Sequence, residues 1–266
     1  MRWLRPSFSS RYPPSADHMH YVSSEQQSAH DMRSLNNIVA LVAGASGGIG
    51  RAIAFDLLGA GAEVLMLGRS LARLVQPPPP EDARGRCHFV VADLTDNGAV
   101  ERIAAEISPR GHLDVLVLSS GIYERSREAA VFARQIAANL LGPYALIQQL
   151  LPLLMEAKGQ VVIVNSTQGL KAAAEVGQYA ATKHALKAVA DSLRDEVNAS
   201  GVRVTSIFLG RTATELQRAI FTAEGRLYPP ERLIQPADVA ELVRFMLQLP
   251  RTSEVTDIVL RPMQKT

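Results

Sequence analysis

The sequence has little of several features that define large classes of proteins. Its one cysteine, Cys87, cannot form an internal disulfide, which favours a reducing compartment and predicts a cytoplasmic protein. The formal net charge is only +2, so no bulk positive field attracts nucleic acid. Aromatic residues make up 5%, too few for a base-stacking surface. No run of about 18 uninterrupted apolar residues occurs, which argues against an ordinary transmembrane helix and predicts no membrane partner.

The chain does have enough apolar material for one sizeable core. Its 266 residues are 47% hydrophobic and 20% charged, a balance typical of a folded α/β domain. Residues 1–35 differ from the rest, because serine and proline are frequent there and no helical or strand period runs through them. We predict a disordered leader over 1–35 and a single Rossmann-type domain over 36–266.

The origin of the leader stays open at this point. Its arginines and serines resemble an organelle transit peptide, but its acidic residues and prolines argue against one. An upstream start codon or an added tail before Met32 would explain the segment. His18 and His20 lie within it, and we expect them to bind no metal.

From residue 37 onward, short aliphatic runs alternate with amphipathic segments. Their continuous apolar character is typical of strands that are buried on both faces of a parallel sheet. The predicted strands cover residues 38–43, 63–67, 88–92, 113–118, 160–164, 202–208 and 256–260. Seven strands with intervening helices predict an α/β fold, a doubly wound Rossmann-type parallel sheet flanked by helices.

A glycine-rich turn follows the first predicted strand and precedes a helix. The turn reads Gly44-Ala45-Ser46-Gly47-Gly48-Ile49-Gly50. Free backbone N–H groups and the positive end of the helix dipole meet there, and a pyrophosphate is their natural occupant. We therefore expect cofactor contacts at Gly44, Ser46, Gly47, Gly48, Ile49 and Gly50.

Tyr179 and Lys183 form a candidate acid–base pair. They are four residues apart at the start of a helical pattern, so their side chains lie on one face. A tyrosine pKa is ordinarily about 10, and a nearby ammonium is expected to lower it towards neutral pH. Ser166 lies at the carboxyl end of a predicted strand, where ligands of such sheets bind. Its hydroxyl can hydrogen-bond a substrate carbonyl oxygen and stabilise a developing alkoxide.

The spacings Gly44-x3-Gly48-x-Gly50 and Ser166-x12-Tyr179-x3-Lys183, together with Asn139, resemble the single-domain short-chain dehydrogenases/reductases over roughly residues 36–266. The resemblance implies a catalytic set of Asn139, Ser166, Tyr179 and Lys183. It also implies cofactor contacts beyond the glycine turn, at Asp93, Leu94, Ser119, Ser120, Gly121, Asn139, Tyr179, Lys183, Gly210, Thr212 and Thr214.

Asn139 has a physical interpretation as well. Pro143 has no N–H to donate to the carbonyl four residues earlier, which is that of Asn139. We therefore expect this carbonyl to be free to hold a water. In the family, the corresponding asparagine binds a water that joins the lysine to a proton relay.

The resemblance implies an oxidoreductase that interconverts a carbonyl and a secondary alcohol on a small-molecule substrate. Tyr179 would act as acid or base, Ser166 would hold the substrate oxygen, and Lys183 would also hold the nicotinamide ribose. An alternative is a nucleotide-sensing regulatory protein on the same scaffold, which would bind cofactor without turnover. The length disfavours an epimerase or dehydratase of the longer relatives.

The cofactor prediction is NADP(H) in preference to NAD(H). The second predicted strand ends at Gly68-Arg69-Ser70, where the ribose 2′ position should lie, and no acidic residue stands there. A guanidinium at Arg69 can pair with a 2′-phosphate, whereas a carboxylate would repel it. The alternative is that Arg69 merely begins the next helix in solvent.

Two further expectations concern surfaces. The predicted helices at 133–155 and 179–197 carry more apolar residues than one sheet face needs, and by resemblance they form homodimer or homotetramer interfaces. Residues 215–235 occupy the place of the family's substrate lid. Gln217, Arg218, Phe221 and Tyr228 are candidate pocket residues there, although ordinary loop contacts are the better interpretation of each.

Overall fold

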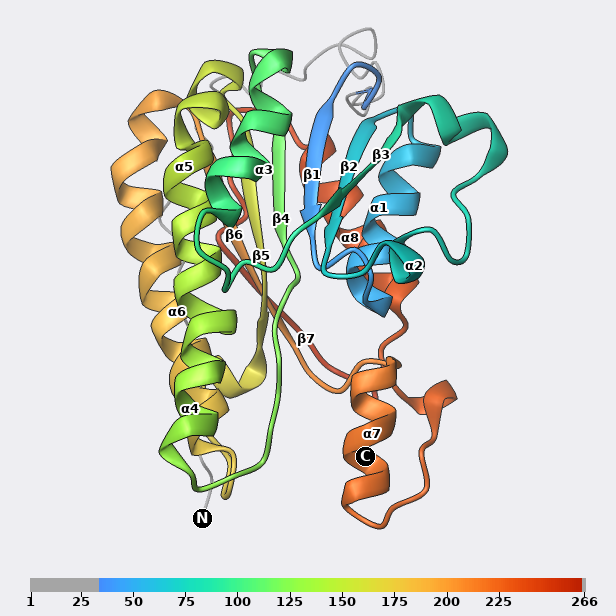
Figure 1. Cartoon of the computed structure of the whole chain (residues 1–266), viewed down its shortest axis with the longest axis vertical. Coiled ribbons are helices and arrows are strands. Elements are labelled where there is room, and N and C mark those ends of the chain that lie inside the picture. Colours follow the sequence, from blue (N-terminus) through green and yellow to red (C-terminus); the bar gives the residue numbers. More distant parts are fainter. Residues whose placement is uncertain (1–33, 265–266) are drawn as a thin grey trace, which may run out of the picture. The chain divides into compact units, whose positions relative to one another are not determined.

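Seven parallel strands form one sheet in the order β3-β2-β1-β4-β5-β6-β7 in the computed structural model, which describes residues 34–264 (Figure 1). The strands are β1 Val39–Ala43, β2 Glu63–Gly68, β3 Cys87–Val91, β4 Val115–Leu118, β5 Gln160–Ser166, β6 Arg203–Leu209 and β7 Asp257–Leu260. Each lies within two residues of a predicted strand, so the predicted doubly wound parallel sheet is confirmed. The leader predicted over 1–35 lies almost wholly outside the described residues.

Helices cover both faces of the sheet. The longer helices are α1 Gly48–Gly59, α3 Ala99–Ile107, α4 Ala129–Ile136, α5 Gly142–Ala157, α6 Gly177–Val197, α7 Glu215–Ala223 and α8 Pro236–Gln248. Short turns complete the set: α2 Leu71–Leu74, η1 Glu81–Arg86, η2 Ser108–Arg110, η3 Ala137–Leu141, η4 Thr167–Gly169, η5 Asn198–Ser200 and η6 Pro230–Arg232. Helices α1 and α8 lie on one face, and α3, α5 and α6 lie on the other (Figure 1).

The alternation of side chains along each strand divides the core into two layers. In β1, Ala40 and Val42 pack into the layer beneath α1 and α8, whereas Val39 and Leu41 pack into the layer beneath α3, α5 and α6. All four are essentially buried because helices cover both faces. This burial explains why the strands are continuous apolar runs in the sequence.

The strand order reverses between β1 and β4, and this reversal positions the site. Ala43 at the end of β1 is in register with Leu67 of β2 on one side and with Leu118 of β4 on the other. The loops that follow these three strands therefore leave the sheet at the same edge. Ligands of doubly wound sheets bind in the crevice at such a switch point.

The predicted helix at 133–155 is interrupted in the structure. A π-helical turn over Ala137–Leu141 joins α4 to α5, and Pro143 stands in the first turn of α5. The feature at Asn139 is therefore a π turn followed by a new helix start, and the water on its carbonyl stays a prediction. Among the described residues, the run Ala129–Ala157 is the one helix that is long and apolar enough to cross a membrane by length and composition. Leu146, Ile147 and Leu150 are fully buried, as in a core helix.

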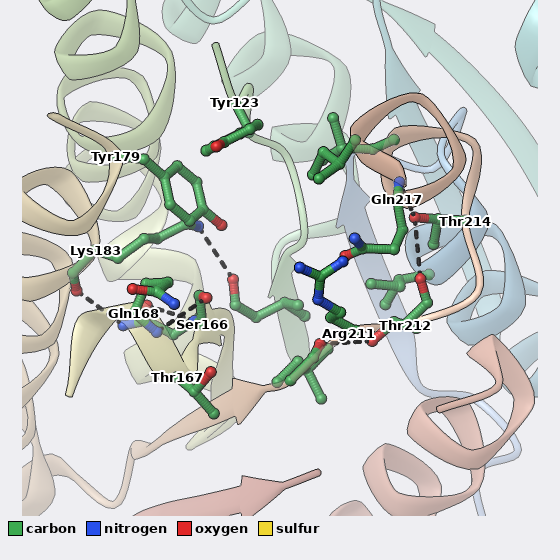
Figure 2. A pocket seen from close by; sticks show the side chains of 18 of the residues that line it. Tyr123, Ser166, Thr167, Gln168, Tyr179, Lys183, Arg211, Thr212, Thr214 and Gln217 are labelled. Atoms are coloured by element: carbon green, nitrogen blue, oxygen red, sulfur yellow. Dashed lines mark hydrogen bonds between the residues drawn. The ribbon is translucent and has the colours of Figure 1, made fainter. Parts of the chain in front are cut away.

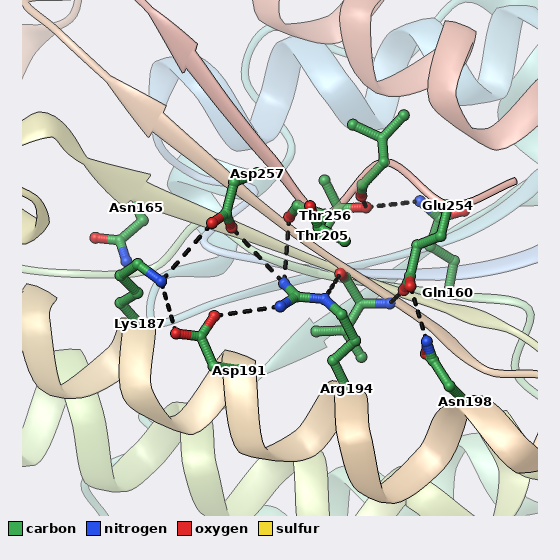
Figure 3. A network of polar contacts seen from close by, with 12 residues as sticks. Gln160, Asn165, Lys187, Asp191, Arg194, Asn198, Thr205, Glu254, Thr256 and Asp257 are labelled. Atoms are coloured by element: carbon green, nitrogen blue, oxygen red, sulfur yellow. Dashed lines mark hydrogen bonds and ion pairs between the residues drawn. The ribbon is translucent and has the colours of Figure 1, made fainter.

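Polar contacts fasten the last strand to α6 (Figure 3). Arg194 of α6 donates to the Val204 carbonyl at 3.0 Å and the Thr256 carbonyl at 3.3 Å, and it pairs with Asp191 at 3.2 Å and Asp257 at 3.7 Å. The network holds the edge strand and the helix that carries Tyr179 and Lys183 in one arrangement.

Candidate active site

The glycine turn predicted from the sequence forms a cradle in which side chains would not fit. Gly44 has φ +85°, and a Cβ placed on it would lie 2.6 Å from the Ser120 backbone nitrogen. A Cβ on Gly50 would lie 2.5 Å from the Gly44 carbonyl oxygen. The turn therefore needs glycine at both positions for backbone conformation and close approach. The helix α1 begins at Gly48, so its free N–H groups open onto the cradle.

A pocket of about 570 Å³ extends from this cradle along the switch point. Its lining includes the glycine turn and Arg69, Asp93, Leu94, Ser119, Ser120, Gly121 and Thr214, all of them expected cofactor contacts. The hydroxyl groups of Ser119 and Ser120 are buried and lack a hydrogen-bond partner among the described residues. Buried polar atoms without partners are rare, and here they belong to residues that line the same pocket as the glycine cradle. These features fit a dinucleotide.

This pocket contains a second arginine that the sequence analysis did not identify. Arg73, on the short helix α2, lines it together with Arg69 and pairs with Glu215 at 2.6 Å. Arg69 is 3.7 Å from Asp93 and its side chain is 70% exposed, so most of its charge faces solvent. Burial opposes ionisation of Asp93, but hydrogen bonds from Thr95 and the charge of Arg69 hold its pKa below the usual value. Sequence reasoning missed Arg73 because only the fold of α2 brings it to the pocket.

A second pocket, of about 250 Å³, contains the predicted catalytic side chains. Ser166 at the end of β5, and Tyr179 and Lys183 on the first turns of α6, all line it (Figure 2). Ile49, Ser119, Ser120, Gly121 and Thr214 line both pockets, so the two are continuous. Gly210 and Thr212, predicted as cofactor contacts, line this second pocket and not the larger one.

Burial controls the protonation of Tyr179. It raises the pKa of Tyr179 to about 12, and the neighbouring Tyr123 adds to this, while a hydrogen bond with Ser166 lowers it. The expectation that the Lys183 ammonium brings this pKa towards neutrality is wrong. The ammonium nitrogen lies 5.8 Å from the centroid of the Tyr179 ring, and the desolvation of the phenol outweighs this interaction. Tyr179 therefore holds its proton at neutral pH.

Lys183 experiences the same desolvation with the opposite effect on its pKa. It is 4% exposed, and among the described residues its ammonium donates one long hydrogen bond of 3.5 Å, to the Val164 carbonyl. Burial lowers its pKa to about 8, so it is still charged at pH 7. The site thus holds a neutral phenol beside an ammonium.

Asn139 lies behind the pockets and not on their surface. Its fully buried side chain accepts from the Ile122 backbone N–H at 2.7 Å and donates to the Ile122 carbonyl at 2.9 Å and to the Thr182 hydroxyl at 3.2 Å. These bonds fasten the loop after β4 to α6. The next residue in that loop, Tyr123, packs edge-on against the Tyr179 ring with centroids 5.3 Å apart. The side chain of Asn139 therefore positions the wall of the catalytic pocket.

The segment from Arg211 to Glu224 forms the opposite wall. Gln217, Leu216 and Ile220 line the pocket from α7, and Arg211 reaches into it in Figure 2. Of the four lid candidates, Gln217 is a pocket residue, whereas Phe221 is buried against Tyr228 and Arg218 stacks on the Tyr228 ring. Tyr123, Arg211 and Glu224 were not predicted as pocket residues, since only tertiary packing brings them there.

The chain is similar in sequence to known proteins. A family model described as short chain dehydrogenase matches residues 38–225. An uncharacterized short-chain type dehydrogenase/reductase, y4eK of Sinorhizobium fredii, is 34% identical over 84% of this chain and 91% of its own length. Dehydrogenase/reductase SDR family member 7B of Rattus norvegicus is also 34% identical, over 73% of this chain and 64% of its own.

Solved structures share the architecture. An alcohol dehydrogenase from the archaeon Thermococcus sibiricus, complexed with 5-hydroxy-NADP, has a TM-score of 0.72 and 26% identity, and the match covers 87% of this chain and 99% of that one. A metagenomic short-chain oxidoreductase in complex with NADP has a TM-score of 0.72 and 27% identity over 88% of this chain and all of that one. Both similarities extend over nearly all of the described residues.

Proposed function

Because the chain belongs to the short-chain dehydrogenase/reductase family, whose members are oxidoreductases of CH–OH and C=O groups, we propose that it is an NADP(H)-dependent enzyme that interconverts a small-molecule carbonyl and a secondary alcohol. The observation that carries the proposal is the meeting of Ser166, Tyr179 and Lys183 in one pocket that is continuous with a glycine-cradled one. The two NADP complexes among the similar structures support the choice of cofactor.

The residues divide the chemistry among them. NADP(H), when bound, would supply or accept the hydride. The Ser166 hydroxyl hydrogen-bonds the substrate oxygen, and the Tyr179 phenol gives its proton to that oxygen as negative charge develops. The Lys183 ammonium stabilises the resulting phenolate and would hold the nicotinamide ribose. Ser119, Ser120 and the glycine turn would hold the remainder of the dinucleotide. Asn139 keeps the Ile122 loop in place.

The intact catalytic set favours an enzyme over a nucleotide sensor on the same scaffold. The test is NADPH oxidation followed by absorbance with a panel of ketones, aldehydes, quinones and acyl-thioester ketones. Tyr179→Phe should bind NADPH with wild-type affinity and lose at least about 100-fold in kcat, because it lacks only the proton donor. Lys183→Ala should lose turnover and also bind NADPH more weakly. Tight NADPH binding without turnover of any carbonyl would favour the sensor.

Two arginines in the larger pocket support a preference for NADPH over NADH. Arg69 and Arg73 both line it, and a guanidinium pairs well with a 2′-phosphate. Arg69→Ala and Arg73→Ala should each weaken NADPH use by about 10-fold or more in kcat/KM and change NADH use little. Arg84→Ala is the matched control, because that arginine pairs with Glu81 on η1 outside the pocket. Equal use of both cofactors by the wild type would refute the preference.

We also propose a cytoplasmic homo-oligomer. Leu141 at the end of η3, and Tyr144 and Met155 on α5, are between 41% and 56% exposed and recur at helical spacing. Exposed apolar residues that gather on one face mark interaction surfaces. Light scattering should give a dimer or tetramer mass, and a monomer would contradict this. Cell fractionation tests the location.

A further inference from the structure

The wall of the catalytic pocket opposite Tyr179 carries an arginine that the proposed reaction does not use. Arg211 follows β6 directly and lines the pocket that contains Ser166, Tyr179 and Lys183. It does not line the larger pocket around the glycine turn. Figure 2 shows its side chain within the pocket, between Ser166 on one side and Thr214 and Gln217 on the other. Its position is thus that of a group that meets the substrate.

Hydrogen bonds within the protein use only part of the donor capacity of the Arg211 guanidinium. Its Nη2 donates to both carboxylate oxygens of Glu224, at 3.2 Å each. Its Nη1 is buried and has no hydrogen-bond partner among the described residues, while 29% of the whole side chain is exposed. A guanidinium can donate five hydrogen bonds, and buried donors without acceptors are costly. An additional acceptor at this wall would therefore be stabilised.

The local charge balance also favours an anion. Glu224 is shared, because its Oε2 also accepts from Arg226 at 3.1 Å. One carboxylate therefore serves two guanidinium groups, and the Lys183 ammonium adds a further positive charge across the pocket. Both arginines stack on the Phe221 ring, with the guanidinium carbons 4.6 Å and 4.9 Å from its centroid, which holds them in place. The pocket wall is cationic and preorganised.

We propose that the substrate of this enzyme is a carbonyl compound that carries a carboxylate, and that Arg211 binds this carboxylate while Ser166 and Tyr179 bind the carbonyl oxygen. The inference rests on the proposed function and specifies its substrate class. A pocket of about 250 Å³ admits a small keto acid whose two groups are separated by a few carbons. Arg211 is then a specificity-determining residue.

The test compares keto acids with their methyl esters at each separation of the two groups, from 2-oxo to 6-oxo carboxylates. In the wild type, kcat/KM for the best acid should exceed that for its ester by at least about 10-fold. Arg211→Met keeps much of the apolar packing on Phe221 but removes the charge, and the acid-to-ester ratio should fall to about 1. Arg211→Lys should give an intermediate ratio, because a point charge replaces the planar guanidinium. Glu224→Gln should lower KM for the acid, since it removes a competing carboxylate.

Arg226→Met is the matched control. Arg226 shares Glu224 and Phe221 with Arg211 but does not line the pocket, so the acid-to-ester ratio should change by no more than about threefold. A wild type that prefers esters, or an Arg211→Met variant that keeps the wild-type ratio, would overturn the inference. Circular dichroism confirms that each variant is folded.

A binding measurement separates this inference from the proposed function. Calorimetry of the NADP⁺-loaded protein with 4-oxopentanoate and its 3-, 5- and 6-oxo homologues, each against its methyl ester, requires no turnover. The best acid should bind the wild type at least about 10-fold more tightly than its ester, and Arg211→Met should remove this difference. Absence of turnover with every carbonyl would refute the proposed function alone. Equal affinity for acids and esters in the wild type would refute the role of Arg211 alone.

Discussion

The Lys183 ammonium lies 5.8 Å from the centroid of the Tyr179 ring, one helical turn away on the same face of α6. Burial acts on both groups and favours the neutral form of each. The result is a tyrosine pKa of about 12 beside a lysine pKa of about 8, so the two groups titrate in the reverse of their usual order. At pH 7 the pair is a phenol and an ammonium, a state suited to giving a proton to a carbonyl oxygen.

This state predicts opposite pH dependences for the two directions of the reaction. Carbonyl reduction needs the phenol and should be nearly constant from pH 6 to about 7.5, then decline as Lys183 loses its proton near pH 8. Alcohol oxidation needs the phenolate and should rise with pH through the same range. Initial rates in both directions at constant ionic strength test this prediction. An oxidation rate that is independent of pH between 6 and 9 would contradict the assignment of Tyr179.

The buried ammonium should lower the stability of the fold. The folded pKa of Lys183 is about 8 and the usual value is 10.5, so the unfolded chain binds the proton more tightly. At pH 7 this difference costs about 3 kcal/mol, and the cost disappears as the pH rises from 8 to 10.5. Lys183→Met should therefore raise the free energy of unfolding by up to about 3 kcal/mol at pH 7.

Urea unfolding of wild type and Lys183→Met at pH 7 and pH 9.5 measures this effect. The gain should shrink at the higher pH, because the wild type approaches its neutral form there. A gain that is equal at both pH values would show that packing, and not charge, is responsible. Lys183→Arg serves as a comparison, since an arginine keeps its charge at either pH.

The cradle predicts that alanine substitutions at two glycines of α1 have different effects on stability and on NADPH binding. Gly50 is the third residue of α1, where an added methyl would lie 2.5 Å from both the Gly44 carbonyl oxygen and the Ser119 hydroxyl. Gly50→Ala should cost about 1–3 kcal/mol and weaken NADPH binding, because the turn must open. Gly59, the last residue of α1, has no atom within 4 Å of such a methyl, so Gly59→Ala should change stability by less than about 1 kcal/mol. Thermal unfolding and NADPH titration measure both.

The network on α6 predicts that Arg194 contributes more to the stability of the fold than Lys187 does. Arg194 is 13% exposed and donates to two backbone carbonyls, so Arg194→Met should destabilise the fold by about 2–3 kcal/mol. Lys187 pairs with the same two aspartates but is 30% exposed and contacts no carbonyl in the network, so Lys187→Met should cost about 1 kcal/mol or less. Denaturant unfolding compares them. Equal costs would contradict the role assigned to the backbone contacts.

The sequence by itself was sufficient for features that local pattern controls. The seven strands were predictable because burial on both sheet faces imposes continuous apolar runs, as in Val39–Ala43. The glycine turn was predictable because a single segment supplies all of its backbone groups. Tyr179 and Lys183 were predictable as neighbours because four residues make one helical turn.

Tertiary structure decided what depends on groups far apart in the chain. Arg73 lines the larger pocket together with Arg69 because the short helix α2 that carries it is packed there. The Asn139 side chain forms hydrogen bonds with the backbone of Ile122, seventeen residues away, and no local sequence pattern predicts these contacts. The direction of the Tyr179 pKa shift was decided by burial, which is a property of the whole packed site and not of the spacing to Lys183. Arg211 lies in the pocket with its guanidinium held by Glu224 and the Phe221 ring, ten or more residues further along the chain, and only packing brings these groups together.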